Sequence, residues 1–240
     1  MFKPSLAVCL STELFHLMQP EGKTVVIVDI FRATSTITSA FWHGCKAIKT
    51  VTSPEEALKL REENYIVAGE QNGDIISGFD LGNSPVALKS FDFSGKKMSL
   101  VTTNGTKALN MSLKASEILT GSFHNLDLLA EYLNHSNRDV IIFCSGWKGH
   151  PCLEDSLFAG ALVDRLERNF TAHQDAALLC NDLYNLAKTD LYAYCTKASH
   201  YARLHEKGIE EDMRNCLELN IYPVVPNLDF ESLELILMNK

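Results

Sequence analysis

Residues 25–39 read VVIVDIFRATSTITS, and this stretch decides the fold class. Its four leading apolar residues predict a strand that is buried on both faces. Asp29 and Arg32 follow that strand, and Thr34 and Ser35 stand where a helix can begin. A helix N-terminus favours anions, and open α/β sheets bind ligands at the carboxyl ends of their strands. We therefore expect an anion or metal site at this point of the chain.

The same strand-to-helix pattern recurs along the sequence. Further strands are predicted at residues 46–51, 65–68, 98–101, 117–119 and 139–143. The later part is mostly helical, with helices expected at 174–187, 191–205 and 209–219 and a short strand at 223–225. We expect one domain over residues 1–240: an α/β/α sandwich in three layers, with a mixed, mostly parallel sheet and a helical C-terminal part.

Composition excludes several classes of partner. The formal net charge of -8 argues against nucleic acid, and no apolar run approaches the roughly 18 residues of a membrane span. Seven widely spread cysteines without a C-x-x-C pair indicate reduced thiols, not a disulfide framework or a zinc site. We therefore expect a cytoplasmic protein without nucleic-acid or membrane partners, and the sequence leaves a homo-oligomer open.

Asp29 and Arg32 are the first candidates for chemistry. A carboxylate after a buried strand can hold a metal ion, and a guanidinium binds phosphate or sulfonate through two hydrogen bonds. The competing interpretations are a helix cap for Asp29 and a surface ion pair for Arg32. An ATPase is disfavoured because no Walker A motif accompanies the strand. An aspartyl-phosphate enzyme of the DxD type is disfavoured because Phe31 stands two positions after Asp29.

A second anion site is expected in the TTNGT turn that follows the strand at 98–101. Hydroxyl and backbone N–H groups can donate to a bound anion there, and a glycine lets the backbone approach it. Two weaker copies follow the next strands, and each of these turns can also be an ordinary helix cap. The residues concerned are Thr102, Thr103, Asn104, Gly105 and Thr106, then Ser122 with Asn125, and Ser145 with Gly146.

Four more acidic residues are candidate Mg²⁺ ligands: Glu70, Asp80, Glu154 and Asp155. The first two lie in the irregular, glycine-rich loop 69–85, and a loop of this length is usually functional. The other two stand at a helix start, where the dipole stabilises carboxylates with or without a metal.

The basic residues and histidines give weaker signals. Lys148 and His150 can neutralise or protonate a leaving oxygen, or lie on the surface of their loop. His200 and His205 are interpreted as surface or helix-packing residues. Cys144 follows a strand, but a cysteine-dependent phosphatase needs an arginine six positions later, where His150 stands.

Several motifs, in order and over nearly the whole chain, resemble those of the 2-phosphosulfolactate phosphatase family. They are Asp29-x-x-Arg32-Ala33-Thr34-Ser35, Gly78-Phe79-Asp80-x-x-Asn83-Ser84-Pro85, the turn Thr102–Thr106, Gly121-Ser122 with Asn125, Ser145-Gly146 and Glu154-Asp155 with Ala159-Gly160. The tail adds Ser199-His200-Tyr201-x-x-Leu204 and Val224-Val225-Pro226.

The resemblance implies a Mg²⁺-dependent phosphatase that converts 2-phospho-3-sulfolactate to sulfolactate and phosphate, a step towards coenzyme M. That substrate carries phosphate, carboxylate and sulfonate, which suits several anion sites on one edge. On this hypothesis Asp29, Arg32, Glu154 and Asp155 are catalytic, and Asn83 and Ser84 join the substrate-binding turns. The metal is held by Asp29 with some of the other four carboxylates.

Three alternatives stay open. Asp29 can act as a covalent nucleophile instead of a metal ligand. The protein can transfer phosphate to an acceptor other than water. It can also be a non-catalytic sensor that binds a phosphorylated acid with the same residues.

Overall fold

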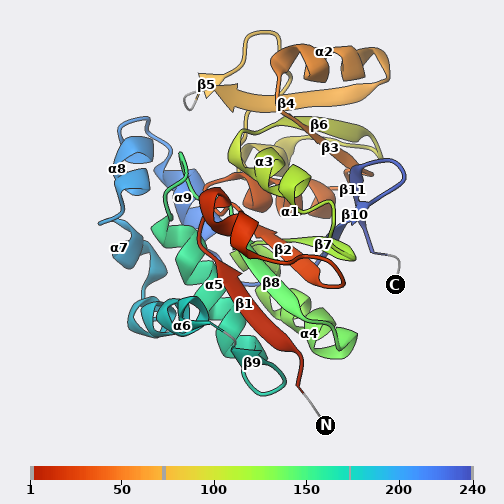
Figure 1. Cartoon of the computed structure of the whole chain (residues 1–240). Coiled ribbons are helices and arrows are strands. Elements are labelled where there is room, and N and C mark those ends of the chain that lie inside the picture. Colours follow the sequence, from red (N-terminus) through yellow and green to blue (C-terminus); the bar gives the residue numbers. More distant parts are fainter. Residues whose placement is uncertain (1–2, 72–73, 173, 239–240) are drawn as a thin grey trace.

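The computed structural model describes residues 3–71, 74–172 and 174–238. Its strands are β1 (Ser5–Cys9), β2 (Thr24–Val28), β3 (Ile48–Val51), β4 (Tyr65–Gln71), β5 (Asp74–Ile75), β6 (Lys97–Val101), β7 (Glu117–Gly121), β8 (Val140–Cys144), β9 (Thr171–Ala172), β10 (Pro226–Asp229) and β11 (Glu234–Leu237). Within the described residues they form an eleven-stranded sheet in the order β5-β4-β6-β3-β11-β10-β7-β2-β8-β1-β9 (Figure 1). Most pairs are parallel, and those of β5, β10 and β11 are antiparallel.

β2 lies between β7 and β8, and all five of its residues are buried. Val26 and Val28 enter the hydrophobic core on one face of the sheet. Val25 and Ile27 enter the core on the other face. The unbroken apolar run in the sequence therefore reflects a strand that is covered on both sides.

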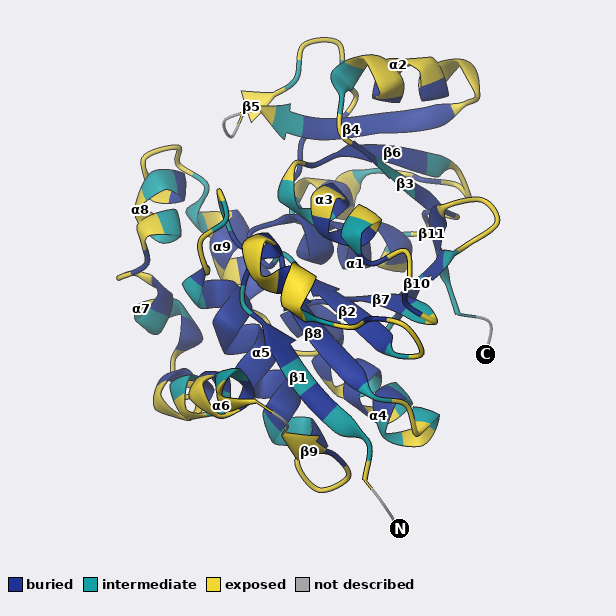
Figure 2. Ribbon diagram, viewed as in Figure 1, coloured by how far each residue is buried: buried dark blue, intermediate teal, exposed yellow. Residues whose placement is uncertain are grey.

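Helices cover both faces of the sheet. They are α1 (Ala33–Trp42), α2 (Pro54–Glu62), α3 (Asn104–Met111), α4 (Leu126–Ser136), α5 (Leu153–Leu166), α6 (Asp175–Ala187), α7 (Leu191–Cys195), α8 (Ser199–His205) and α9 (Glu210–Cys216), with 3₁₀ turns η1 (Thr12–Leu17), η2 (Ala87–Ser90) and η3 (Phe123–Asn125). The core of α1 and α3 is separate from that of α4, α5 and α6. Figure 2 shows α5 mostly buried and α6 with one exposed side. The expected α/β/α sandwich with a helical C-terminal part is confirmed.

Several elements differ from the sequence expectation. β1 was not predicted, and the strand expected at 223–225 lies at Pro226–Asp229, where it forms a hairpin with β11. No glycine marks the hairpin turn. Asp229 closes it by accepting hydrogen bonds from the Ser232 N–H (3.2 Å) and hydroxyl (2.6 Å). The helix expected over 191–205 is divided into α7 and α8.

The helices of the described segments are all too short or too polar to cross a bilayer.

Candidate active site

A cavity of about 390 Å³ opens at the carboxyl ends of the parallel strands. Its walls come from the residues that end or follow β2, β4, β6 and β8, together with α8. Chain segments that are distant in sequence therefore meet at the edge where the strand-to-helix turns predicted a ligand. Seven of the predicted site residues line it: Asp29, Arg32, Glu70, Asn83, Thr102, Thr103 and Asn104.

Asp29 is placed in this cavity by the turn between β2 and α1. Its backbone N–H donates to Thr34 Oγ1 (3.1 Å), and the Thr34 hydroxyl donates to the Asp29 carbonyl oxygen (3.0 Å). The side chain accepts a longer hydrogen bond from the Ala33 N–H (3.4 Å). Thr34 therefore shapes the turn and does not line the cavity.

The carboxyl group of Asp29 lies in an environment that opposes its charge. The pKa of Asp29 is raised from 3.8 to about 6. Loss of solvation is the largest cause, His200 and the Ala33 N–H act against it, and the charges of Glu154 and Glu70 add to it. Asp29 is half-buried: it lines the cavity, and protein surrounds the rest of its side chain. A cation bound here would relieve this cost.

Arg32 is buried and forms an ion pair with Asp212 of α9. Asp212 also accepts a hydrogen bond from the Ser84 hydroxyl (2.6 Å) and a longer one from the Val86 N–H (3.4 Å). The positive charge of Arg32 is therefore largely compensated within the protein. Ser84 serves this network and is not part of the cavity wall.

The TTNGT turn lies beside Asp29. The Thr106 N–H donates to Thr102 Oγ1 (3.0 Å), so Thr102 caps the first turn of α3. A Cβ atom at Gly105 would lie 3.4 Å from Asp29 Oδ2 and 3.3 Å from the Ala33 methyl group. The glycine thus lets the start of α3 approach the Asp29 carboxylate closely.

Among the other acidic candidates, Glu70 lines the cavity. Asp80 holds its own loop against β4, since it accepts the Val67 N–H (2.8 Å) and pairs with Arg61 (3.0 Å). The structure therefore places Asp80 outside the cavity lining.

Asp155 joins two strand-end loops. It accepts hydrogen bonds from the Ile30 N–H (2.9 Å), after β2, and from the Gly146 N–H (3.1 Å), after β8. Burial, followed by the charges of Glu154 and Asp29, raises the pKa of Asp155 well above its usual value. Its contacts make Asp155 a positioning residue for the loop that carries Asp29.

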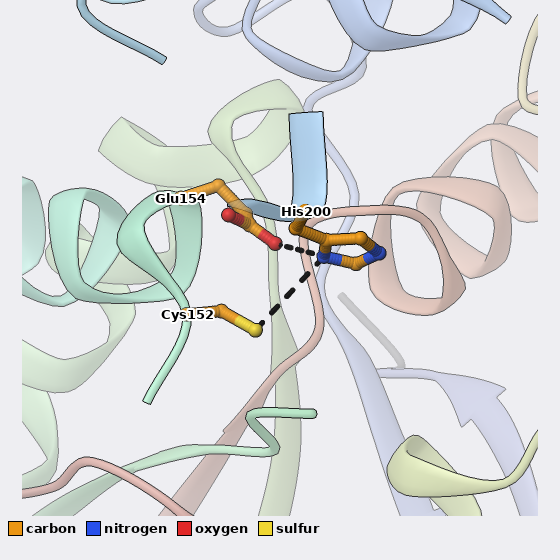
Figure 3. A group of neighbouring side chains, drawn as sticks. All are labelled: Cys152, Glu154 and His200. Atoms are coloured by element: carbon orange, nitrogen blue, oxygen red, sulfur yellow. Dashed lines mark hydrogen bonds and ion pairs between the residues drawn. The ribbon is translucent and has the colours of Figure 1, made fainter. Parts of the chain in front are cut away.

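Glu154 is fully buried in the first turn of α5 and contacts His200 of α8. Its Oε1 lies 2.5 Å from His200 Nδ1, and Cys152 Sγ lies 3.9 Å from the same nitrogen (Figure 3). His200 also lines the cavity beside Phe31 and Trp147. The interpretation of His200 as a surface or packing residue is therefore wrong.

Two cations line the cavity next to one aromatic ring, and we call this group the cationic wall: Lys148, Arg203 and Trp147. The guanidinium of Arg203 lies 4.2 Å from the Trp147 ring centroid, and Lys148 Nζ lies 4.4 Å from it. Arg203 Nε is buried and, among the described residues, has no hydrogen-bond partner. Stacking on the indole orients these cations, which are available to an anionic ligand.

The remaining predicted residues lie outside the cavity lining. The Ser35 hydroxyl donates to the Ile30 carbonyl (2.9 Å), and the Ser145 N–H donates to the Val28 carbonyl (2.8 Å). Ser122 and Asn125 form a capping box, with the Ser122 N–H donating to Asn125 Oδ1 (3.0 Å). These contacts build the turns of the site.

Sequence reasoning missed Trp147, His200, Arg203 and Asp212 as residues of the site. His200 lay within a quoted family motif, which was the one available signal. Lys148 was considered only as one of two loop cations. The contacts of Trp147, Arg203 and Asp212 depend on how α8 and α9 dock, which the pattern of residues does not specify.

Comparison with known proteins identifies the family of the chain. The family model for 2-phosphosulpholactate phosphatase matches residues 9–230. A probable 2-phosphosulfolactate phosphatase of Thermotoga petrophila is 38% identical over 208 residues, 87% of this chain and 90% of that protein. Relatives with the same name are 36% identical in Caldanaerobacter subterraneus (86% and 88% of the two chains) and 35% identical in Clostridium acetobutylicum (86% and 89%). The expected enzyme class, a phosphoric monoester hydrolase, is confirmed, and the chain belongs to the 2-phosphosulfolactate phosphatase family.

Proposed function

We propose that this protein is a Mg²⁺-dependent phosphatase that hydrolyses 2-phospho-3-sulfolactate, or a closely related monoester with several negative charges. The observation that carries the proposal is one cavity that is lined by both carboxylates and cations. Asp29 and Glu70 supply the carboxylates, and Lys148 and Arg203 supply the cations. The products would be the hydroxy acid and inorganic phosphate.

The residues of the cavity fit a magnesium ion. Mg²⁺ prefers oxygen ligands and keeps several water molecules, so a few protein oxygens suffice. Asp29 and Glu70 both line the cavity, and Asn83 contributes a buried Oδ1 that has no hydrogen-bond partner among the described residues. Among the five predicted ligands, the contacts of Asp80 and Asp155 favour positioning roles, and Glu154 lies outside the cavity lining, where it contacts His200. When bound, the ion would neutralise phosphoryl oxygens and orient a water molecule.

The protein's own groups would bind and orient the substrate. Hydrolysis joins a water oxygen to phosphorus, breaks the ester P–O bond and leaves a proton on the departing oxygen. The start of α3, next to Asp29, offers N–H groups to the phosphoryl oxygens. Arg203 and Lys148 would bind the sulfonate or carboxylate, because Arg32 is already paired with Asp212.

The first test is phosphate release from 2-phosphosulfolactate and from a simple alkyl phosphate, each with Mg²⁺ and with EDTA. We expect metal-dependent release that favours the sulfonated ester and is lost in Asp29→Asn. The absence of turnover on every ester, with stoichiometric binding retained, would refute the phosphatase and leave the sensor.

The second test addresses the cationic wall. Arg203→Ala should raise KM for the sulfonated ester by about tenfold or more, the usual effect of losing a charge-assisted hydrogen bond. The simple alkyl phosphate should be affected much less. Arg168→Ala, on an exposed arginine, is the matched control. Equal effects of Arg203→Ala on both esters would contradict the assignment of this residue to the second anionic group.

A further inference from the structure

Three potential metal ligands, a sulfur, an oxygen and a nitrogen, converge next to the cavity, and one of them belongs to a residue of its lining, His200. Cys152 precedes α5, Glu154 lies in the first turn of that helix, and His200 comes from α8. The Cys152 sulfur, a Glu154 carboxylate oxygen and a His200 ring nitrogen lie within 4.8 Å of one another. Figure 3 shows the three side chains pointing toward one another.

These side chains are withdrawn from solvent, and one of them is incompletely satisfied. Cys152 is 7% exposed and Glu154 is 1% exposed. Within the described part of the chain, Glu154 Oε2 is buried without a hydrogen-bond partner. Buried carboxylates are usually fully paired or bound to a metal ion, because an unsatisfied one destabilises the folded protein.

A hydrogen bond between Glu154 and His200 explains part of this arrangement. It accounts for Glu154 Oε1 and His200 Nδ1, which are 2.5 Å apart. The Cys152 sulfur is within hydrogen-bond distance of the same nitrogen, at 3.9 Å, but neither contact involves the unpartnered Oε2. A positive ion among the three would explain why three metal-binding donor atoms converge and why a buried carboxylate oxygen has no other partner.

We propose that Cys152, Glu154 and His200 bind a divalent transition-metal ion of the zinc class. Sulfur, imidazole nitrogen and carboxylate oxygen are the donors of zinc sites, and three protein ligands leave a position for water or substrate. Mg²⁺ takes oxygen donors, so this site differs in chemistry from the Asp29 and Glu70 carboxylates. The inference goes beyond the proposed function and does not depend on it.

The protons of the site balance in a simple way. Cys152 binds as a thiolate and releases its thiol proton to solvent. Neutral His200 binds through Nδ1 and carries its proton on Nε2, while Glu154 exchanges its hydrogen bond for a bond to the metal. One proton is released per ion bound. Burial, followed by the negative charges of Asp155, Glu154 and Asp29, raises the pKa of the Cys152 thiol, so the thiol loses its proton only as the ion binds. The same negative charges attract a cation.

Cobalt(II) tests the proposal without any activity measurement. The full chain is stripped of metal with a chelator and titrated with Co²⁺ while its absorption spectrum is recorded. We expect a thiolate-to-cobalt charge-transfer band in the near ultraviolet that saturates at one Co²⁺ per chain, whether or not the Asp29 and Glu70 carboxylates bind a second ion. Zn²⁺ should remove the band, and Mg²⁺ in large excess should leave it unchanged.

Variants assign the ligands. Cys152→Ser should abolish the charge-transfer band, and His200→Asn should weaken Co²⁺ binding by at least about tenfold. The matched control is Cys45→Ser, a buried cysteine in the core on the opposite face of the sheet, which should keep the band. Circular dichroism of each variant identifies loss of folding.

Three results would overturn the proposal: no stoichiometric binding, binding without the charge-transfer band, or a band that persists in Cys152→Ser. Should Cys152→Ser fail to fold, the spectrum of the unaltered protein still decides whether a thiolate binds the ion. Asp29→Asn separates the two hypotheses, because it should lose phosphate release and keep the cobalt spectrum.

Discussion

Replacing Asp29 by Asn should stabilise the metal-free protein, although the same change removes the proposed activity. The carboxylate is surrounded by protein, and the charges of Glu154 and Glu70 oppose its ionisation. Asn has nearly the same shape and can still accept the hydrogen bond from the Ala33 N–H. The substitution therefore removes an unfavourable charge without removing a major contact.

The size of the effect follows from the pKa of Asp29. The ordinary value of 3.8 describes the unfolded chain, and the folded value is about 6. Below pH 3.8 the group is protonated in both states, so it does not destabilise the fold. As pH rises through 6, the folded protein loses up to about 3 kcal/mol, at about 1.4 kcal/mol per pKa unit. Asp29→Asn should restore about that amount at pH 7.5 and about 1 kcal/mol at pH 4.5.

Urea unfolding in EDTA, followed by tryptophan fluorescence at both pH values, measures this difference. Asp182→Asn, on an exposed residue of α6, controls for the loss of one negative charge. Added Mg²⁺ should stabilise the unaltered protein more than the variant, because ligands stabilise the state that they bind. The reasoning is refuted if Asp29→Asn is no more stable at pH 7.5, or if its gain does not shrink at pH 4.5.

Three further substitutions test other contacts. Asp212→Asn leaves a buried guanidinium uncompensated and should lower the free energy of unfolding by about 3–5 kcal/mol in urea titrations. Gly105→Ala places a methyl group 3.1 Å from Thr102 Oγ1 and 3.3 Å from the Ala33 methyl group, so the start of α3 must shift beside Asp29, and kcat for phosphate release should fall about tenfold or more. Gly160→Ala places Cβ 1.9 Å from the Cys180 carbonyl oxygen, and calorimetry should show a loss of about 1–3 kcal/mol or more.

Each of these tests has a result that would contradict it. Glu13→Gln breaks the exposed ion pair with Lys107 and should change the free energy of unfolding by less than about 1 kcal/mol. If Asp212→Asn loses no more than this control, burial of the Arg32–Asp212 pair does not increase the cost of breaking it. Unchanged kcat in Gly105→Ala would show that the start of α3 can retreat from Asp29. An unchanged melting temperature in Gly160→Ala would show that α5 and α6 can separate without loss.

The strands and their helix-opening turns were largely predictable, because their signals are local. The unbroken apolar run of β2 predicts a strand, and the same residues explain why the strand is buried on both faces. Ser53 stands directly before Pro54, the first residue of α2, and its hydroxyl oxygen accepts the Glu56 N–H at 3.1 Å, a cap that local sequence alone specifies. Asp29 was found for the same reason, since its place at a strand end depends only on its neighbours in sequence.

The partners of the site residues were not predictable in this way. Arg32 and Asp212 are 180 positions apart, and Glu154 and His200 are 46 apart. Both contacts depend on how α8 and α9 dock, which residue periodicity does not specify. The same limit explains why Asp80 and Asp155 were proposed as metal ligands. An acidic residue in a loop or at a helix start gives the same sequence signal whether it accepts backbone N–H groups or faces a cavity.

The hairpin of β10 and β11 determines when the sheet can be completed during synthesis. It lies in the middle of the sheet, with Asn227 opposite Leu119 of β7 and Leu235 opposite Ile48 of β3. The strands on either side belong to residues 5–172, which leave the ribosome much earlier. The two halves of the sheet therefore wait, with open edges toward each other, until residues 226–237 have been synthesised. During translation this protein exposes an unpaired gap that a chaperone or a second nascent chain can occupy, and the last strands to emerge close it.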